Sequence, residues 1–229
     1  AKQLTSLSVS DHANPIKASL KQLAANADVF KAISGDYRLA VEGVTAADLV
    51  KLSANSKVYT MALNDTASNI IKAQKTIKTN GIYEKIGQVT LTDTKPISLS
   101  INDAAYLKSL PNITMPSTGY SLADTTKNIL ARLRYDPNSL LSGANSIIFT
   151  DKSPAVLTVD DARLLKSMPT LATKAKYSIA DSDSAITIQN QIDGETILSG
   201  ATAITMVRTL SVSAAKQIFK QSKITNSAQ

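Results

Sequence analysis

The sequence predicts an α/β repeat protein built from about four stacked strand–helix–strand–strand–helix units, which together form a solenoid-like array. Three observations predict this fold class. Segments of the 229-residue chain recur at an offset near 58 positions, which is the signature of repeat architectures. Each copy joins short runs of β-branched residues to stretches with apolar residues at helical spacing. Hydrophobic residues make up 43% of the chain and aromatic residues only 4%, so the core is expected to be aliphatic.

Three pairs of segments carry the repeat. Residues 101–111 (INDAAYLKSLP) return as residues 159–169 (VDDARLLKSMP), and residues 120–124 (YSLAD) return as residues 177–181 (YSIAD). The segment LTDTKP returns as FTDKSP in the same order and at nearly the same offset. Because one unit is too small to bury both faces of its elements, neighbouring units are expected to stack, with divergent units at the ends. The expected units are residues 1–58, 59–116, 117–173 and 174–229.

Each unit is expected to open with a short strand that ends in an aspartate and leads into a helix. In the first unit Ile16, Leu20 and Leu23 follow Asp11 at helical spacing. An aspartate at the start of a helix accepts hydrogen bonds from the free N–H groups of the first turn. The aspartates expected to cap the first helix of the four units are Asp11, Asp65, Asp124 and Asp181.

A pair of strands and a second helix complete the unit. In the second unit the strand pair is residues 89–91 and 97–99, with a turn at residues 93–96 between them. Pro111 and Pro169 are expected to end the second helix of the two middle units. The third unit has its strands at residues 147–149 and 156–159 and its turn at residues 151–154. The expected N-caps of the second helix are Thr45, Asn102, Asp160 and Ser213, the first in a capping box with Asp48.

Short strings inside these units resemble a known class of repeats. Residues 63–70 (LNDTASNI), 122–129 (LADTTKNI) and 159–164 (VDDARL) look like the "DTAANI"-type repeats of large bacterial surface and secreted proteins, which are often adhesin-like or exported by type I secretion. The resemblance covers most of residues 4–220 and implies an extracellular, multi-copy scaffold. No GGxGxD string occurs, so the chain departs from the calcium-binding nonapeptide of many exported proteins.

The residues needed for common catalytic and cofactor sites are missing from the sequence. The chain has no Cys and a single His, His12, which follows Asp11 and is expected on the surface. Serine triads usually need a histidine base, and neither a P-loop nor a GxGxxG string occurs. We therefore predict that the chain is not an enzyme and has no catalytic, cofactor-binding or metal-binding residues.

Carboxylates are the only side chains of the sequence suited to holding a metal ion. The densest groups are Asp160–Asp161 and the pair Asp181 and Asp183, to which Asp93 or Asp151 could add ligands from the turns. Calcium needs several oxygen ligands, so a calcium site is an alternative to caps and turns. Paired aspartates also carry out glycoside hydrolysis, but acidic residues that recur with the repeat favour a structural role.

The net charge of +7 comes from Lys and Arg residues spread along the chain. The C-terminal segment is the exception, because no acidic residue follows Glu195. That tail could contact an acidic polymer or a membrane surface, whereas no nucleic-acid partner is expected without a recognisable motif. Residues 1–20 hold no signal-peptide core, and no apolar run is long enough to span a bilayer. The basic residues of the tail are Arg208, Lys216, Lys220 and Lys223.

These features predict a non-enzymatic structural or adhesive module of a bacterial extracellular or cell-surface protein. Its expected partners are copies of itself, in a layer or filament, or a cell-surface polymer, either as a homo-oligomer or as part of a longer repeat chain. Strands near Val9 or Val212 could present free edges to another chain. Two alternatives stay open: a carbohydrate- or ligand-binding module that uses the turns at residues 93–95 and 151–153, and binding of an acidic surface by the basic tail.

Overall fold

The computed structural model has two compact units. Unit 1 comprises Ala1–Ile97 and Ala105–Thr118, and unit 2 comprises Ser98–Ala104 and Gly119–Gln229. The division between them passes through one helix, α7 (Ile101–Lys108). The structure describes residues 6–79, 81–135, 143–153, 155–166, 177–182, 184–186, 198, 200–207 and 224–225.

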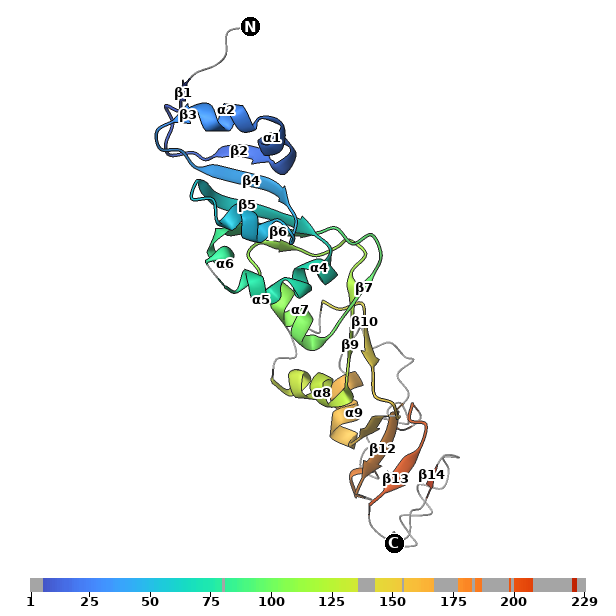
Figure 1. Cartoon of the computed structure of the whole chain (residues 1–229). Coiled ribbons are helices and arrows are strands. Elements are labelled where there is room, and N and C mark those ends of the chain that lie inside the picture. The colour runs from blue at the N-terminus through green and yellow to red at the C-terminus, as the bar shows by residue number, and fades with distance from the viewer. Residues whose placement is uncertain are drawn as a thin grey trace. The chain divides into compact units, whose positions relative to one another are not determined.

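Unit 1 contains a five-stranded parallel sheet in the order β2-β4-β5-β6-β8 and a two-stranded parallel sheet of β1 and β3 (Figure 1). The strands of the larger sheet lie side by side in chain order, although the chain forms a strand of another sheet between β2 and β4 and between β6 and β8. Each connection leaves one end of a strand and returns to the start of the next strand of the sheet. The strands of unit 1 are β1 (Leu7–Ser8), β2 (Ile16–Ser19), β3 (Ile33–Ser34), β4 (Leu39–Val44), β5 (Val58–Asp65), β6 (Ile86–Leu91) and β8 (Ile113–Thr114). Its helices are α1 (Leu20–Ala25), α2 (Ala27–Ala32), α3 (Leu49–Ser53), α4 (Ala67–Lys72), α5 (Gln74–Ile77) and α6 (Ile82–Lys85).

The core of unit 1 lies between one face of this sheet and the connecting helices. Val44, Leu63 and Val89 are neighbours across β4, β5 and β6, and none is more than 1% exposed. Residues that alternate with them, such as Ala62 and Thr90, are only half-buried. Because side chains alternate between the two faces of a strand, one face of the sheet is buried and the other is open. The helices complete this core with Leu49, Leu52, Ile70, Ile77 and Ile82.

Unit 2 repeats the pattern with a three-stranded sheet in the order β10-β9-β7 and a four-stranded sheet in the order β11-β12-β13-β14. Every pairing recorded between its strands is parallel. Leu157, Ile179 and Ile204 lie side by side in the second sheet and are at most 1% exposed. The strands are β7 (Ile97–Leu99), β9 (Tyr120–Asp124), β10 (Ser146–Phe149), β11 (Ala155–Leu157), β12 (Tyr177–Asp181), β13 (Ile204–Met206) and β14 (Ile224–Thr225). The helices are α8 (Thr126–Tyr135) and α9 (Val159–Lys166).

The fold is mixed α/β with parallel sheets, and the predicted element order is present from β9 to α9, where the chain runs strand, helix, strand, strand, helix. From β5 to α7 three helices, α4, α5 and α6, stand where the prediction had one. The two strands that flank each turn do not form a pair, however. β6 belongs to the five-stranded sheet and β7 to the three-stranded one, and β10 and β11 are likewise in different sheets. The turns therefore carry the chain from one sheet to the next.

The first repeat departs from the prediction. Asp11 caps no helix: its carboxylate accepts hydrogen bonds from the backbone N–H groups of Ala13 and Asn14 and from the Asn14 side chain. Pro15 follows, which disfavours helix at the residue before it, and the next element is strand β2, which contains Ile16. Leu20 and Leu23 do lie in a helix, α1, which Ser19 caps in a capping box with Gln22.

Candidate functional site

The string L-x-D-T-x-x-N-I is a helix start in which each named position has a structural role. In residues 63–70, Thr66 is the N-cap and accepts the Asn69 N–H at 3.3 Å. The Asn69 side chain donates to Asp65 Oδ1 at 2.7 Å, and Ile70 is fully buried. The same contacts recur in residues 122–129, where Asn128 donates to Asp124 at 2.7 Å and to the Thr125 hydroxyl. The motif that carried the family resemblance is therefore explained by capping and core packing.

The aspartate of this motif also reaches back to the connection that precedes it. Asp65 ends β5, and its Oδ2 accepts the N–H of Ala46, which follows the neighbouring strand β4, at 2.9 Å. Asp124 ends β9 and accepts the N–H of Ile101, the first residue of α7, at 3.0 Å. Asp181 ends β12 and accepts the N–H of Val159, the first residue of α9, at 2.9 Å. We call each of these contacts a carboxylate clamp.

The aspartates of the turns make the same contact. Asp93 follows β6 and accepts the N–H of Ala67, the first residue of α4, at 2.8 Å. Asp151 follows β10 and accepts both the N–H of Thr126, at 2.7 Å, and its hydroxyl, at 2.6 Å. Each clamp lies within one compact unit and joins the end of one strand to the segment that follows the strand beside it. The clamp aspartates are Asp65, Asp93, Asp124, Asp151 and Asp181.

The clamps of Asp65, Asp124 and Asp151 stabilise the charged form of these carboxylates. Burial raises the pKa of Asp65 and of Asp124, but hydrogen bonds from two N–H groups and from an Asn side chain outweigh it, so both values lie below the ordinary 3.8. Hydrogen bonds from the hydroxyl and the N–H of Thr126 lower the pKa of Asp151. These aspartates are therefore charged at neutral pH, beside the positive ends of short helices.

The predicted caps of the second helix lie two residues too far along the chain. Ser100, and not Asn102, accepts the N–H of Asp103 at 3.1 Å at the start of α7. Thr158, and not Asp160, accepts the N–H of Asp161 at 3.1 Å at the start of α9. The predicted capping box at Thr45 and Asp48 is instead a turn that precedes α3, and Ser213 lies outside the described residues. Pro111 does follow the end of α7 at Lys108, as predicted, and Pro169 is not among the described residues.

The carboxylates that could have formed a calcium site have other partners. Asp160 pairs with Arg163 at 3.2 Å on the surface, and Asp161, which is 8% exposed, pairs with Arg134 of α8. Asp93, Asp151 and Asp181 are held in clamps, and Asp183 lies outside the described residues. Among the described residues no group of three or more His, Asp or Glu side chains is placed to hold a metal ion.

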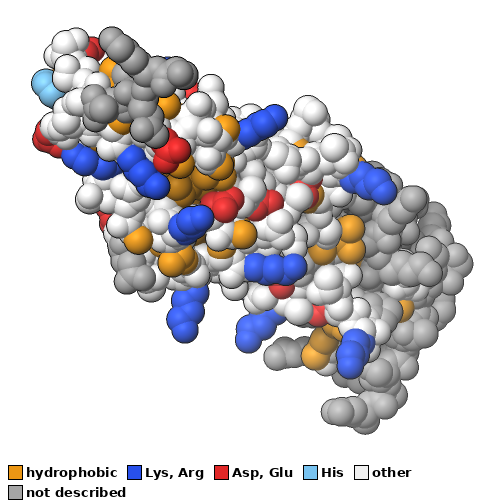
Figure 2. All heavy atoms as spheres, turned by 45° about the horizontal axis from the view of Figure 1, so that its top comes forward, with side chains coloured by type: hydrophobic (Ala, Val, Ile, Leu, Met, Phe, Trp, Pro, Cys, Tyr) orange, Lys and Arg blue, Asp and Glu red, His pale blue; other side chains and the backbone are white. Residues whose placement is uncertain are grey.

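The remaining predicted features are distributed over the surface. His12 is exposed, and its Nδ1 lies 2.6 Å from the Asp36 carbonyl oxygen. Figure 2 shows Lys and Arg side chains spread over the face in view. In the parts that the structure covers, no helix has the length and apolar character to cross a bilayer. Val9 follows strand β1, whereas Val212 and the basic side chains of the C-terminal tail lie outside the described residues.

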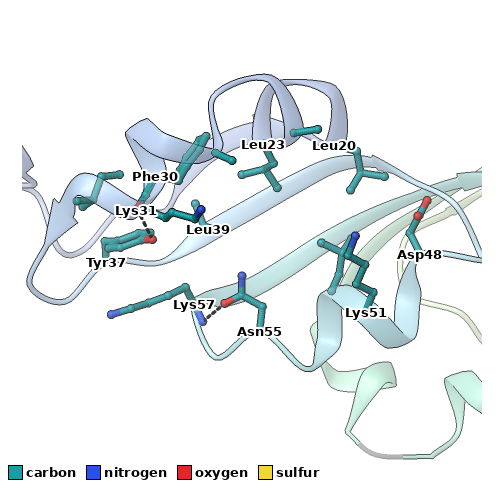
Figure 3. A pocket seen from close by; sticks show the side chains of 14 residues that line it. Leu20, Leu23, Phe30, Lys31, Tyr37, Leu39, Asp48, Lys51, Asn55 and Lys57 are labelled. Atoms are coloured by element: carbon teal, nitrogen blue, oxygen red, sulfur yellow. Dashed lines mark hydrogen bonds between the residues drawn. The ribbon is translucent and has the colours of Figure 1, made fainter. Parts of the chain in front are cut away.

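A groove that the sequence did not predict lies in unit 1 between α1–α2 and α3 (Figure 3). Its volume is about 580 Å³, and Leu20, Leu23 and Phe30 contribute half-buried apolar side chains to its lining. A second cavity of about 500 Å³ adjoins it, because both are lined by Tyr37 and Lys57. The other residues of this second, basic cavity are Asp36, Arg38, Ser56, Val58, Tyr59 and Lys85.

Comparison with known proteins finds one kind of relative. No protein-family model matches the chain, and no solved structure matches it. The chain is 30% identical over 188 residues to an S-layer protein of Synechocystis sp. (strain ATCC 27184 / PCC 6803 / Kazusa). The match covers 82% of this chain but only 10% of that relative's length.

Proposed function

We propose that this chain is a non-enzymatic structural module of a bacterial surface layer, and that its DTAANI-like strings mark successive turns of a solenoid-like array. The carboxylate clamp is the observation that carries the proposal. Within the described part of the chain it recurs at five places, each time between neighbouring strands, and each time it holds the start of a helix or of the turn before one. A contact that repeats with the fold serves the fold at every position, which is how repeat proteins gain stability from nearest neighbours.

The chemistry of the clamps also favours a scaffold over an enzyme. A catalytic carboxylate has to face a substrate, usually with a pKa raised toward the working pH. The clamp oxygens of Asp65 and Asp124 face N–H donors of the chain itself, and their pKa values are lowered. The same clamps occupy Asp93 and Asp151, the acidic residues of the turns that a carbohydrate ligand would have to use.

The similarity to the S-layer protein supports a surface location and assembly with further repeats or copies. The relative is about ten times as long as the region it shares with this chain, since the match covers 10% of it. A module of stacked turns suits such a protein, because identical contacts can continue from one module to the next. We propose that the module acts at the cell surface and that its partners are copies of itself or a cell-surface polymer.

Electron microscopy and sedimentation of the purified chain test this proposal. We expect sheets, filaments or concentration-dependent oligomers, or sedimentation together with an isolated cell-surface polymer. The Asp124→Ala variant, which loses a clamp, should assemble less, whereas Asp160→Ala removes the same charge from an exposed site and should assemble like the unmodified chain. Dispersed monomers at every concentration, with no binding to polymer, would contradict the proposal.

A further inference from the structure

We propose that the groove of unit 1 and the basic cavity beside it bind a single-chain anionic amphiphile, with the aliphatic chain in the groove and the acidic head in the basic cavity. Small-molecule sites are concave, mostly apolar, and carry a few polar groups that fix the orientation of the ligand. The two cavities meet these conditions together, because one is mainly apolar, the other carries three basic residues and one acidic residue, and they share Tyr37 and Lys57.

The apolar side chains that α1 and α2 contribute to the groove are only partly buried by the described part of unit 1. Helices α1 and α2 bury no residue fully, although Leu20, Leu23 and Phe30 face the groove (Figure 3). Helices α4, α5 and α6 are of similar length, and each of them buries at least one side chain. Below the helices, Leu39 is 2% exposed and Leu52 is 9% exposed, so the groove has a packed apolar base. An aliphatic chain would cover the half-buried leucines and the phenylalanine.

The charges around the two cavities select a negative ligand. The groove carries Lys31 and Lys51, and Asp48 is its one acidic residue. Lys31 pairs with Asp28 at 3.8 Å, but both side chains are largely exposed, at 79% and 101%, and such pairs contribute little. The positive charges therefore remain able to attract an anion.

The basic cavity is arranged to hold an acidic head group. The Arg38 guanidinium lies 4.9 Å from the centre of the Tyr59 ring, a cation–π contact that leaves its N–H groups able to donate. Lys85 donates to the Ser53 carbonyl oxygen at 2.9 Å, and Lys57 pairs with Asp36 at 3.5 Å. Arg38, Lys57 and Lys85 thus face one acidic residue, so a phosphate or carboxylate head finds an excess of positive charge.

A second copy of the chain suits this site less well. The net charge of the chain is +7, so a second copy would bring mainly positive charge to a cationic rim. An anionic amphiphile supplies both the apolar surface and the negative charge that the two cavities lack.

Isothermal titration of the intact chain with monododecyl phosphate below its critical micelle concentration tests the proposal. We expect saturable binding of one molecule per chain, about tenfold or more tighter than inorganic phosphate, dodecyl maltoside or dodecyltrimethylammonium. Laurate should also bind, because the head group is read by charge. Arg38→Gln, at an exposed residue, should weaken binding of dodecyl phosphate by about tenfold, and Leu23→Asp should abolish it.

The control is Lys75→Gln, which removes a positive charge from an exposed residue of α5 that lines neither cavity. It should bind like the unmodified chain, and circular dichroism should show all variants folded. If Leu23→Asp does not fold, Arg38→Gln decides the test. Absent or unsaturable binding, equal binding of the cationic amphiphile, or equal binding by Arg38→Gln would overturn the proposal. Binding only to anionic vesicles, or a concentration-dependent dimer in place of amphiphile binding, would overturn it as well.

Discussion

Removal of one clamp carboxylate, in the variant Asp124→Ala, should destabilise unit 2 by about 2–4 kcal/mol. Asp124 accepts three hydrogen bonds, from the N–H groups of Ile101 and Thr125 and from the Asn128 side chain, at 2.7–3.0 Å. Hydrogen bonds to charged groups contribute about 1.5–3 kcal/mol each. Three such bonds would sum to about 4.5–9 kcal/mol. Asp124 is only half-buried, so water replaces much of what is lost, and the expected loss falls to about 2–4 kcal/mol.

Urea unfolding followed by circular dichroism measures this effect, with Asp160→Ala as the matched control. The Asp160 side chain is 89% exposed and makes an ion pair with Arg163, the kind of contact that contributes about 0–1 kcal/mol. Both variants remove one negative charge from unit 2, so the difference between them isolates the clamp. If Asp124→Ala and Asp160→Ala unfold at the same urea concentration, the clamp does not stabilise unit 2, and this result would refute the stabilising role proposed for it.

Three further predictions concern the pH dependence of the clamp, the core of unit 2 and a partly buried ion pair. Because hydrogen bonds lower the pKa of Asp124 below its ordinary 3.8, its contribution to stability should be complete above that pH and be lost as the pH falls through the lower, folded value; urea midpoints between pH 7 and pH 2.5 should show this loss, and Asp124→Ala should flatten it. Ile129→Ala should cost about 2–5 kcal/mol, since Ile129 is fully buried, whereas Val156→Ala, at 66% exposure, should leave the urea midpoint nearly unchanged. Arg134→Ala should destabilise the chain by about 1–2 kcal/mol by leaving the buried Asp161 without its ion pair, and a double-mutant cycle with Asp161→Asn should show coupling; additive effects would refute the pairing.

Local sequence patterns predicted much of the fold because the elements are short and are bounded by capping and turn residues. The repeat near 58 residues, the strand before each Asp-Thr string and the helix after it are all present in the middle of the chain. The pairing of the strands was not predictable in the same way. A turn such as residues 93–96 is compatible with a pair of flanking strands, and only the tertiary packing shows that β6 and β7 join different sheets.

The sequence predicted the position of some clamp aspartates but not the contacts that they make. Asp65 and Asp124 were predicted to cap the helix that follows, but not to contact the connection that precedes their strand. The contact with Ala46 or Ile101 depends on the register of the neighbouring parallel strand, which a local motif does not encode. The cap of α7 was misplaced as well: Ser100, two residues before Asn102, accepts the Asp103 N–H, and Asp124 accepts the N–H of Ile101, the first residue of α7.

The groove was not predicted because its lining reads as ordinary core. Leu20, Leu23 and Phe30 have the helical spacing of residues that pack against a sheet. What leaves them half-buried is the gap between α1–α2 and α3, which appears only in the structure.

Amide hydrogen exchange most directly tests the central claim, that each carboxylate clamp holds the end of one strand to the segment that follows the neighbouring strand. The N–H groups at the start of a helix lack a partner within the helix and normally exchange fast. We expect slow exchange at the clamp amides. In Asp124→Ala the exchange rate of the Ile101 amide should rise roughly tenfold or more, whereas that of the Thr126 amide, which is bonded to Asp151, should change little. Exchange at Ile101 as fast as in an unfolded chain, or unaffected by Asp124→Ala, would contradict it. The clamp amides to be followed are those of Ala46, Ala67, Ile101, Thr126 and Val159.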